Sequence, residues 1–282
     1  MFQSDIPFIS GYENRIRRKR NTMDKLRNMT FSEFASSWWR WDTCPYVLER
    51  REAGTEKHPL IKKRTVQGNY SWTQNYLIPY FGKTKIQSIT PRMITKFLSS
   101  LKPGLSNKTI NNIRETLNIM MEDAVKRELI HSNPVSATLP RAEDKKEHIL
   151  LTDDECNTLF AEKNMKKLWN DDILSYTYSF TAGLTGLRAG ELLALAFDDI
   201  RPDSINVSKS YDSENREITT TKTSEERTIP ITHEIYRLLH VCYHSHPEGN
   251  NRFVFSLDGE EPMKEAVLAK SFLQSHGWNR NQ

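Results

Sequence analysis

The sequence has few cysteines, no long apolar run and no start typical of a secreted protein. No hydrophobic stretch approaches the roughly 18 residues that a membrane-spanning helix needs, so we expect no contact with a membrane. The beginning lacks a basic segment followed by an apolar one, which argues against a secretory signal. Cys44, Cys156 and Cys242 are odd in number and widely spaced, which argues against a disulfide framework and a C-x-x-C zinc site. We therefore predict a protein of the reducing cytoplasm.

The formal net charge of +4 conceals an uneven distribution of charge. Residues 1–150 contain 26 Lys and Arg against 15 Asp and Glu, whereas residues 151–282 contain 14 against 21. A basic half joined to an acidic half favours contact between the basic half and a polyanion, of which nucleic acid is the commonest. The alternative is that these charges lie on solvated helix surfaces.

The basic half divides into an arm, a helical domain and a linker. Residues 1–29 show no apolar periodicity and contain the run RIRRKR, which predicts either an arm that follows phosphates or a solubilising tail. Helical periodicity then continues through a bundle of about four helices, so residues 30–140 are predicted to form one domain. The charged and aperiodic residues 141–151 are predicted to be a linker.

Several helix ends in this domain can be predicted from local patterns. Thr30 and Glu33 form a capping-box pattern, and Thr90 is the expected cap of a helix that starts with a proline. Pro79 and Gly82 are expected to stop the helix that begins near residue 64. Pro134 is expected to end the long helix that follows.

The long helix has an apolar face and an opposite face rich in Lys and Asn. Such a polar face can reach phosphates and base edges, or it can simply face water. The residues predicted to contact DNA in this domain are Lys62, Lys63, Arg64, Lys108, Asn111 and Asn112.

Residues 152–282 are predicted to form a second domain. Thr152 and Glu155 give a second capping-box pattern at its beginning. The segments DSINVSKS, REITTTK and RTIPIT alternate and are rich in Ile, Val and Thr, so they predict three short strands, with TSEE as a hairpin turn between the last two. The whole chain is thus expected to be mainly α with a small antiparallel sheet.

The stretch TGLRAGELLAL, residues 185–195, contains the main candidate for chemistry. Arg188 follows a glycine-containing turn at the start of an apolar helical run, and Glu191 comes three residues later. A guanidinium held there could bind two phosphate oxygens, and Lys222 at a strand end could protonate a leaving oxygen. A buried Arg–Glu pair that fastens a helix would have the same spacing.

Two other chemistries are poorly supported. HVCYHSHPE places His and Cys at even offsets, whereas a helix sets ligands three or four residues apart, so we predict no metal site. GLTGLRAGE lacks the Lys-Ser/Thr pair of a phosphate-binding loop, which argues against a nucleotide site.

The stretch TGLRAGELLALAFDDI resembles the first-arginine motif of the tyrosine recombinase (phage integrase) family. YLIPYFGKTKIQSITPRMITKFL, LSNKTINNIRETLNIMMEDAVKRELIHSNP, HILLTDDECNTLF and TKTSEERTIPI resemble further segments of the same family, in the same order. The resemblance covers nearly the whole chain. It implies an N-terminal helical core-binding (SAM-like) domain and a partial α+β catalytic domain.

The resemblance also implies a mechanism without metal or cofactor. In that family a tyrosine attacks the scissile phosphate and forms a phosphotyrosyl link, while two arginines and a histidine stabilise the transition state. By resemblance, Arg188 is the first of these arginines, Glu191 supports it, and Lys222 is the general acid.

The family's H-x-x-R motif and tyrosine nucleophile are not found in the sequence. Tyr236 and Tyr243 come too early in the order of motifs to be the nucleophile. We expect a C-terminally truncated integrase that binds double-stranded DNA, with other recombinase protomers, but cannot form the covalent intermediate alone. The alternatives are part of an active recombinase completed by a missing or separate C-terminal segment, and a non-catalytic helical interaction module.

Overall fold

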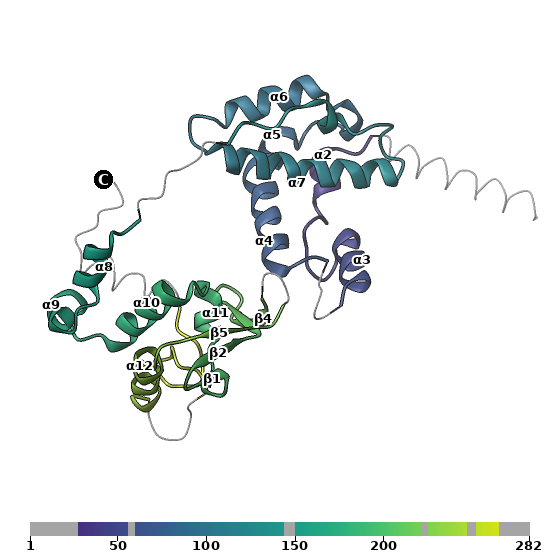
Figure 1. Ribbon diagram of the computed structural model, residues 1–282. Helices are drawn as coiled ribbons and strands as arrows, with labels where there is room; N and C mark the ends of the chain where they lie inside the picture. Colours follow the sequence, from purple (N-terminus) through teal and green to yellow (C-terminus); the bar gives the residue numbers. More distant parts are fainter. Residues whose placement is uncertain (1–27, 56–59, 144–149, 222–224, 247–251, 265–282) are drawn as a thin grey trace, which may run out of the picture. The chain divides into compact units, whose positions relative to one another are not determined.

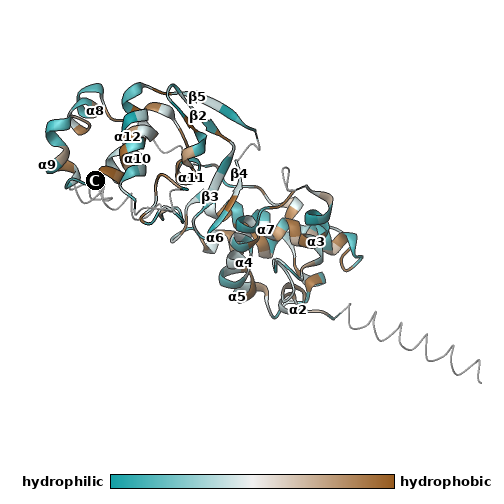
Figure 2. Cartoon of the chain, turned by 90° about the horizontal axis from the view of Figure 1, so that it is seen from below, coloured by the Kyte–Doolittle hydropathy of each residue, from teal (hydrophilic) through white to brown (hydrophobic). Residues whose placement is uncertain are grey.

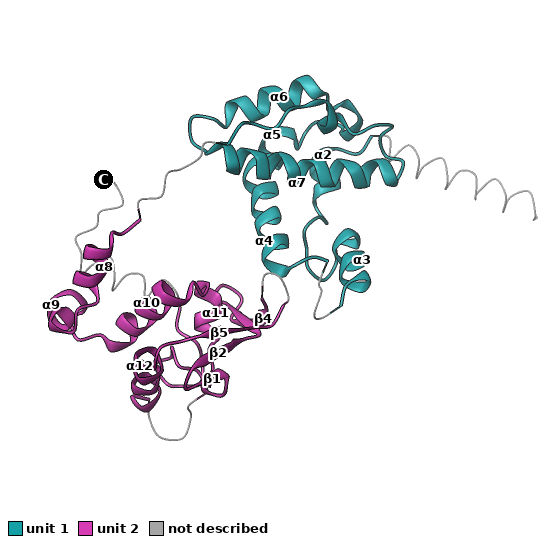
Figure 3. Ribbon diagram, in the orientation of Figure 1, with its two compact units in different colours: residues 1–147 teal, residues 148–282 magenta. Residues whose placement is uncertain are grey.

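The computed structural model describes residues 28–55, 60–143, 150–221, 225–246 and 252–264. The chain divides into two compact units, residues 1–147 and residues 148–282 (Figure 3). The first unit is helical, and the second combines helices with short antiparallel strands (Figure 1). The predicted mainly α fold with a small antiparallel sheet is thereby confirmed. None of the helices in the described ranges combines the length and apolar character that a membrane crossing requires.

The first unit is built from helices joined by short turns. Its helices are α2 (Phe31–Ala35), α3 (Pro45–Ala53), α4 (Lys63–Trp72), α5 (Ile78–Phe81), α6 (Pro91–Ser100) and α7 (Asn107–Lys126). Both predicted caps are formed. The Thr30 hydroxyl accepts from the Glu33 amide at 3.3 Å while the Glu33 carboxylate accepts from the Thr30 amide at 2.8 Å. The Thr90 hydroxyl accepts from the Met93 amide at 3.3 Å.

Both prolines that were expected to end helices act differently. A π turn at Thr73–Leu77 follows α4, and Pro79 then lies in the first turn of α5, where its missing N–H leaves no helical hydrogen bond unmade. The path therefore stays helical to Phe81, and Gly82, the other expected stop, follows as the C-cap of α5. Helix α7 ends at Lys126, well before Pro134, because Glu128 adopts a left-handed φ of 59° that turns the chain.

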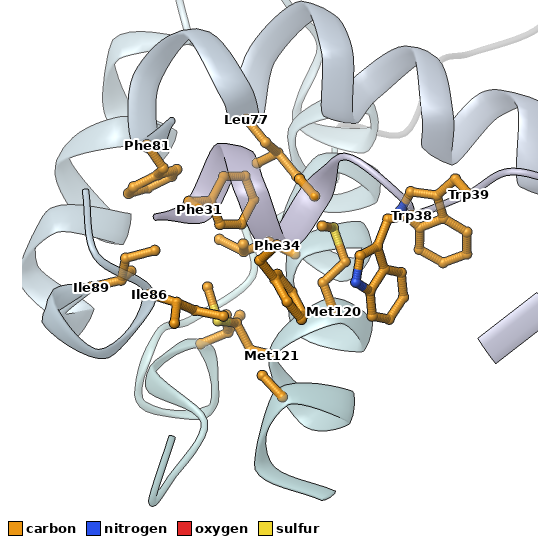
Figure 4. Packing of buried hydrophobic residues seen from close by; sticks show 14 of the residues in the cluster. Phe31, Phe34, Trp38, Trp39, Leu77, Phe81, Ile86, Ile89, Met120 and Met121 are labelled. Atoms are coloured by element: carbon orange, nitrogen blue, oxygen red, sulfur yellow. The ribbon is translucent and has the colours of Figure 1, made fainter. Parts of the chain in front are cut away.

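One continuous hydrophobic cluster fills the first unit. Figure 4 shows Phe31 and Phe34 of α2 beside Leu77 and Met120, and the rings of Phe31 and Phe81 meet edge to face at 5.9 Å. Helix α7 has one fully buried face, and hydrophilic and hydrophobic residues alternate along the helices in Figure 2. Phe31, Phe34, Trp38 and Trp39, near the beginning of this unit, are therefore core residues.

The second unit places short strands beside its helices. The helices are α8 (Asp153–Leu159), α9 (Met165–Trp169), α10 (Ile173–Thr185), α11 (Ala189–Leu193) and α12 (His233–His244). The strands are β1 (Ile200–Arg201), β2 (Ser204–Val207), β3 (Lys209–Asp212), β4 (Glu217–Thr220) and β5 (Arg227–Pro230). The predicted capping box is present, with the Thr152 hydroxyl accepting from the Glu155 amide at 3.3 Å and the Glu155 carboxylate from the Thr152 amide at 2.8 Å.

The pairing of the strands differs from the prediction. The segments REITTTK and RTIPIT were expected to form a hairpin with each other, but among the described residues β4 pairs with β3 and β5 pairs with β2. Strand β2 is the centre of an antiparallel sheet in the order β1-β2-β5, in which Val207 lies opposite Arg227. This register brings the beginning of β5 to the end of β2, and it places Arg227 at the site described next.

Candidate functional site

A reversal of the chain between α10 and α11 presents Arg188. Helix α10 ends at Thr185 and is capped by Gly186, whose φ of +66° is the left-handed conformation that glycine adopts without strain. Arg188 then has extended backbone and caps α11, and the Glu191 carboxylate accepts a hydrogen bond from the Arg188 amide at 3.0 Å. The short helix therefore begins with Arg188 and its carboxylate partner fixed to each other.

Three charged side chains meet around the Glu191 carboxylate. The Arg188 Nη1 donates to Glu191 Oε1 at 2.9 Å. The Arg227 Nη1 and Nη2 donate to Oε1 at 3.1 Å and to Oε2 at 2.6 Å, in the two-pronged geometry that favours arginine. We call these three residues the arginine clamp.

The clamp has a buried carboxylate and accessible guanidinium groups. The side chain of Glu191 is 1% exposed, whereas those of Arg188 and Arg227 are 52% and 35% exposed. Burial by itself raises the pKa of the Glu191 carboxyl. Hydrogen bonds from Arg227 and from the backbone and side chain of Arg188 outweigh that effect and lower the pKa to about 2. Glu191 is therefore negatively charged near neutral pH, and the Arg188 guanidinium extends from it toward solvent.

Helix α11 packs closely against β3 because Gly190 has no side chain at the point of contact. A Cβ atom added at Gly190 would lie 2.5 Å from the Ser210 hydroxyl and 2.9 Å from the Tyr211 carbonyl oxygen. Only glycine allows the helix to approach the strand this closely. In the turn after α11, the Asp199 carboxylate accepts from Lys209 Nζ at 2.8 Å and from the Ala196 amide at 2.9 Å, which ties this turn to β3.

The structure brings together two of the three predicted catalytic residues. Arg188 and Glu191 are in contact through an ion pair, and about half of the arginine side chain is exposed, so the role of Arg188 in binding phosphate stays a prediction. Lys222 lies outside the described residues. Arg227 was missed by the sequence analysis. The signal available in the sequence was a charged residue opening the alternating strand segment RTIPIT.

The predicted DNA-binding residues lie in two places in the first unit. Lys62, Lys63 and Arg64 lie at the start of α4. On α7, Lys108 forms a 3.0 Å ion pair with Glu143. The amide group of Asn111 bonds to the backbone of Arg141, donating to its oxygen at 2.9 Å and accepting from its nitrogen at 2.8 Å. The Asn111 side chain therefore fastens the first residues of the predicted linker to α7, and Asn112, one residue on, is half-buried.

Three histidines lie in the last part of α12 and just after it. His240 and His244 are one helical turn apart, with ring centroids separated by 5.9 Å, while the buried His246 contacts the Ser256 carbonyl oxygen at 3.0 Å through Nε2. Burial, together with the neighbouring His244, lowers the pKa of His240. Within the described ranges, no group of three or more His, Cys, Asp or Glu side chains is arranged to hold a metal ion.

Comparison with known proteins confirms the resemblance to the phage integrase, or tyrosine recombinase, family. Residues 55–102 match the family model of the phage integrase N-terminal SAM-like domain. The fold is shared with integrases of known structure. One match is the Tn1549 transposon integrase in complex with a circular intermediate DNA, with a TM-score of 0.64 and 22% identity over 84% of this chain and 81% of that one. Another is a lambda integrase dimer bound to a COC′ core site, with a TM-score of 0.65 and 18% identity over 88% and 80% of the two chains.

Two curated relatives are also integrases. The ICEBs1 integrase of Bacillus subtilis is 34% identical over 182 residues, which are 61% of this chain and 48% of the relative. An integrase of Streptomyces ambofaciens is 24% identical over 139 residues, which are 49% of this chain and 34% of the relative. The matched part thus spans about half the length of the first relative and about a third of the second.

Proposed function

We propose that the chain is an integrase-type, site-specific DNA recombinase that acts in the cytoplasm and in which Arg188 binds the DNA backbone. The observation that supports this most directly is the arginine clamp, where a buried carboxylate holds a guanidinium that is half exposed. A guanidinium is charged at all physiological pH values and offers donors that match two phosphate oxygens. Held in a fixed position, it can also stabilise the negative charge that develops on a phosphate under attack.

The proposal that double-stranded DNA is the partner is supported by the integrases of similar fold. The Tn1549 integrase and lambda integrase structures contain DNA, and lambda integrase is seen as a dimer and as a tetramer on its DNA. The first unit supplies the charge for such contacts, because the excess of Lys and Arg lies there. We therefore propose that Lys62, Lys63, Arg64 and Lys108 contribute phosphate contacts and that other protomers bind the same DNA.

Loss of the Arg188 side chain tests the proposal. In gel-shift titrations with a 30-base-pair duplex at about 50 to 200 mM salt, we expect Arg188→Ala to weaken binding about tenfold and to lower the salt dependence by about one phosphate contact. The matched control is Arg237→Ala, which removes the same charge from an exposed position on α12. Equal effects of the two variants, or no binding by the parent chain, would contradict the proposal.

A second measurement concerns the covalent step. We propose that this 282-residue chain alone does not form a phosphotyrosyl link, because no H-x-x-R sequence occurs in it and Tyr236 and Tyr243 come too early in the order of motifs to be the nucleophile. A nicked suicide substrate should therefore trap no covalent complex. Trapping by this chain alone would refute the statement, and trapping only after a second polypeptide is added would favour a recombinase completed by another segment.

The gel-shift titration also tests the third alternative. If this chain does not shift the duplex at all, a helical interaction module that does not bind DNA is favoured.

A further inference from the structure

The Glu191 carboxylate is fully used as a hydrogen-bond acceptor. Its two oxygens accept from four donors, namely Arg188 N and Nη1 and Arg227 Nη1 and Nη2. Two carboxylate oxygens offer about four lone-pair positions, so the group has no capacity left for another donor. Arg227 supplies two of the four donors, while the Arg188 guanidinium supplies one.

The number of donors bears on what Arg188 can do. Within the described ranges, Nη1 is the one guanidinium nitrogen of Arg188 with a hydrogen bond, and this leaves most of its five N–H groups facing the exposed side. Arg227 is held more tightly, since both of its terminal nitrogens are bound to Glu191, and its side chain is less exposed, 35% against 52% for Arg188. Of the two guanidinium groups, Arg188 is therefore the better placed to contact a ligand.

The charges of the clamp lead to a second consequence. Two guanidinium groups and one carboxylate have a net charge of +1, equal and opposite to the charge of one phosphodiester. Without Arg227, the pair of Arg188 and Glu191 would be neutral, and a buried carboxylate beside the only guanidinium would oppose the approach of a phosphate.

We propose that Arg227 is a positioning residue that sets the charge of this site: it neutralises Glu191, so that Arg188 is both held in place and free to bind a phosphate. The inference rests on the proposed DNA-binding function. The competing interpretation is a tether, in which the ion pair only fastens β5 to α11. The two differ in one respect, because the tether needs the contact between the side chains, whereas the charge-setting role needs the sum of the charges.

Three variants of the full chain separate the two roles. Arg227→Gln removes the charge, Arg227→Lys keeps the charge but loses the two-pronged contact, and the double variant Glu191→Gln/Arg227→Gln removes both charges and restores the sum of +1 through Arg188. The probe is a 30-base-pair duplex of arbitrary sequence, titrated at several salt concentrations. Thermal unfolding of each variant shows that it is folded.

We expect Arg227→Gln to bind the duplex about tenfold more weakly than the parent, with the salt dependence lowered by about one phosphate contact. Arg227→Lys and the double variant should bind within about threefold of the parent. The salt dependence is the informative quantity, since a tether would change the melting temperature without changing the number of phosphates neutralised.

The inference is overturned if Arg227→Gln binds like the parent, or if the double variant binds as weakly as Arg227→Gln while it is folded. Failure of the parent chain to bind the duplex would instead refute the proposed function, on which the inference depends. Should Arg227→Gln not fold, Arg227→Lys and the double variant still decide the matter, because the tether model predicts that the double variant is the weaker of the two.

Discussion

Among the described residues, the first unit buries its apolar side chains in one continuous cluster, whereas the second divides its own between a larger cluster and a small one around Trp169. The first unit has its charged residues mostly on the surface, apart from the buried Asp123, which pairs with Arg127 at the end of α7. The second unit buries Glu191 between two arginines beside its larger cluster. The stability of the first unit therefore depends on apolar packing, and the local structure around α11 depends in addition on a buried charge. The contrast teaches that the part with the candidate chemistry contains a buried carboxylate, Glu191, whose strongly lowered pKa should make the stability of this part respond to pH.

The largest effect is expected in the core of the first unit. Phe97 is almost fully buried and meets Phe81 at 5.1 Å, so Phe97→Ala should lower the free energy of unfolding of this unit by about 3–5 kcal/mol. Hydrogen exchange measured by mass spectrometry should show a loss of protection in residues 60–143 and unchanged protection in residues 189–212. The exposed Lys96→Ala on the same helix is the control and should change stability by less than about 0.5 kcal/mol. Loss of protection in both units would break the comparison.

A matched pair of glycines tests the close packing of the second unit. Gly190→Ala should destabilise it by about 1–3 kcal/mol and weaken duplex binding, because the new Cβ would meet the Tyr211 carbonyl oxygen and push α11 from β3. Gly183→Ala, in the exposed last part of α10, meets nothing within 4 Å and should stabilise the helix by up to about 1 kcal/mol. Urea denaturation of both variants measures the difference. If both variants changed the free energy of unfolding in the same direction, the contact between α11 and β3 would not be tight in solution.

The pH dependence of the second unit should report on Glu191. Its pKa is about 2 in the folded protein, below the ordinary value of 4.5, so its stabilising contribution is complete above about 4.5 and is lost as the pH falls toward 2. Glu191→Gln should lower stability at neutral pH and flatten this acid-side decline for residues 189–212. Hydrogen exchange of parent and variant over this range is the measurement. An unchanged decline in the variant would mean that other carboxylates cause it.

The smallest loss of stability is expected from removing a helix cap, and it should be the same in both units. The capping boxes at Thr30 and Thr152 have nearly identical distances, so Thr30→Ala and Thr152→Ala should each cost about 1 kcal/mol. The exposed Thr65→Ala within α4 is the control, with little expected change. Exchange of the Glu33 and Glu155 amides measures local opening. A large difference between the two boxes would show that tertiary contacts, rather than the caps, decide the stability of these short helices.

The sequence predicted much of the first unit because its signals are local. Caps such as Thr30 and Thr90 depend on residues within one turn, and an amphipathic helix such as α7 shows its buried face in its spacing. The end of α7 was placed too far along because the turn at Glu128 has no proline or glycine to indicate it. A residue that adopts φ > 0 without being glycine gives little warning in a sequence.

The candidate site was predictable in part for the same reason. Arg188 and Glu191 are three residues apart, so their contact follows from a single helical turn. Arg227 is 36 residues from Glu191 along the chain, and its position follows from the pairing of β5 with β2. That pairing was predicted wrongly, since short strands that all alternate offer several registers of similar pattern.

The sequence by itself determined the helices, their caps, the division into a basic and an acidic part, and the local pair of Arg188 and Glu191, because each depends on neighbouring residues. Only the tertiary structure decided that Arg227 completes the clamp, that Gly190 lies against β3, and that Asn111 is engaged with Arg141. These contacts join residues distant in sequence, and they depend on strand register and helix packing, which local spacing does not specify.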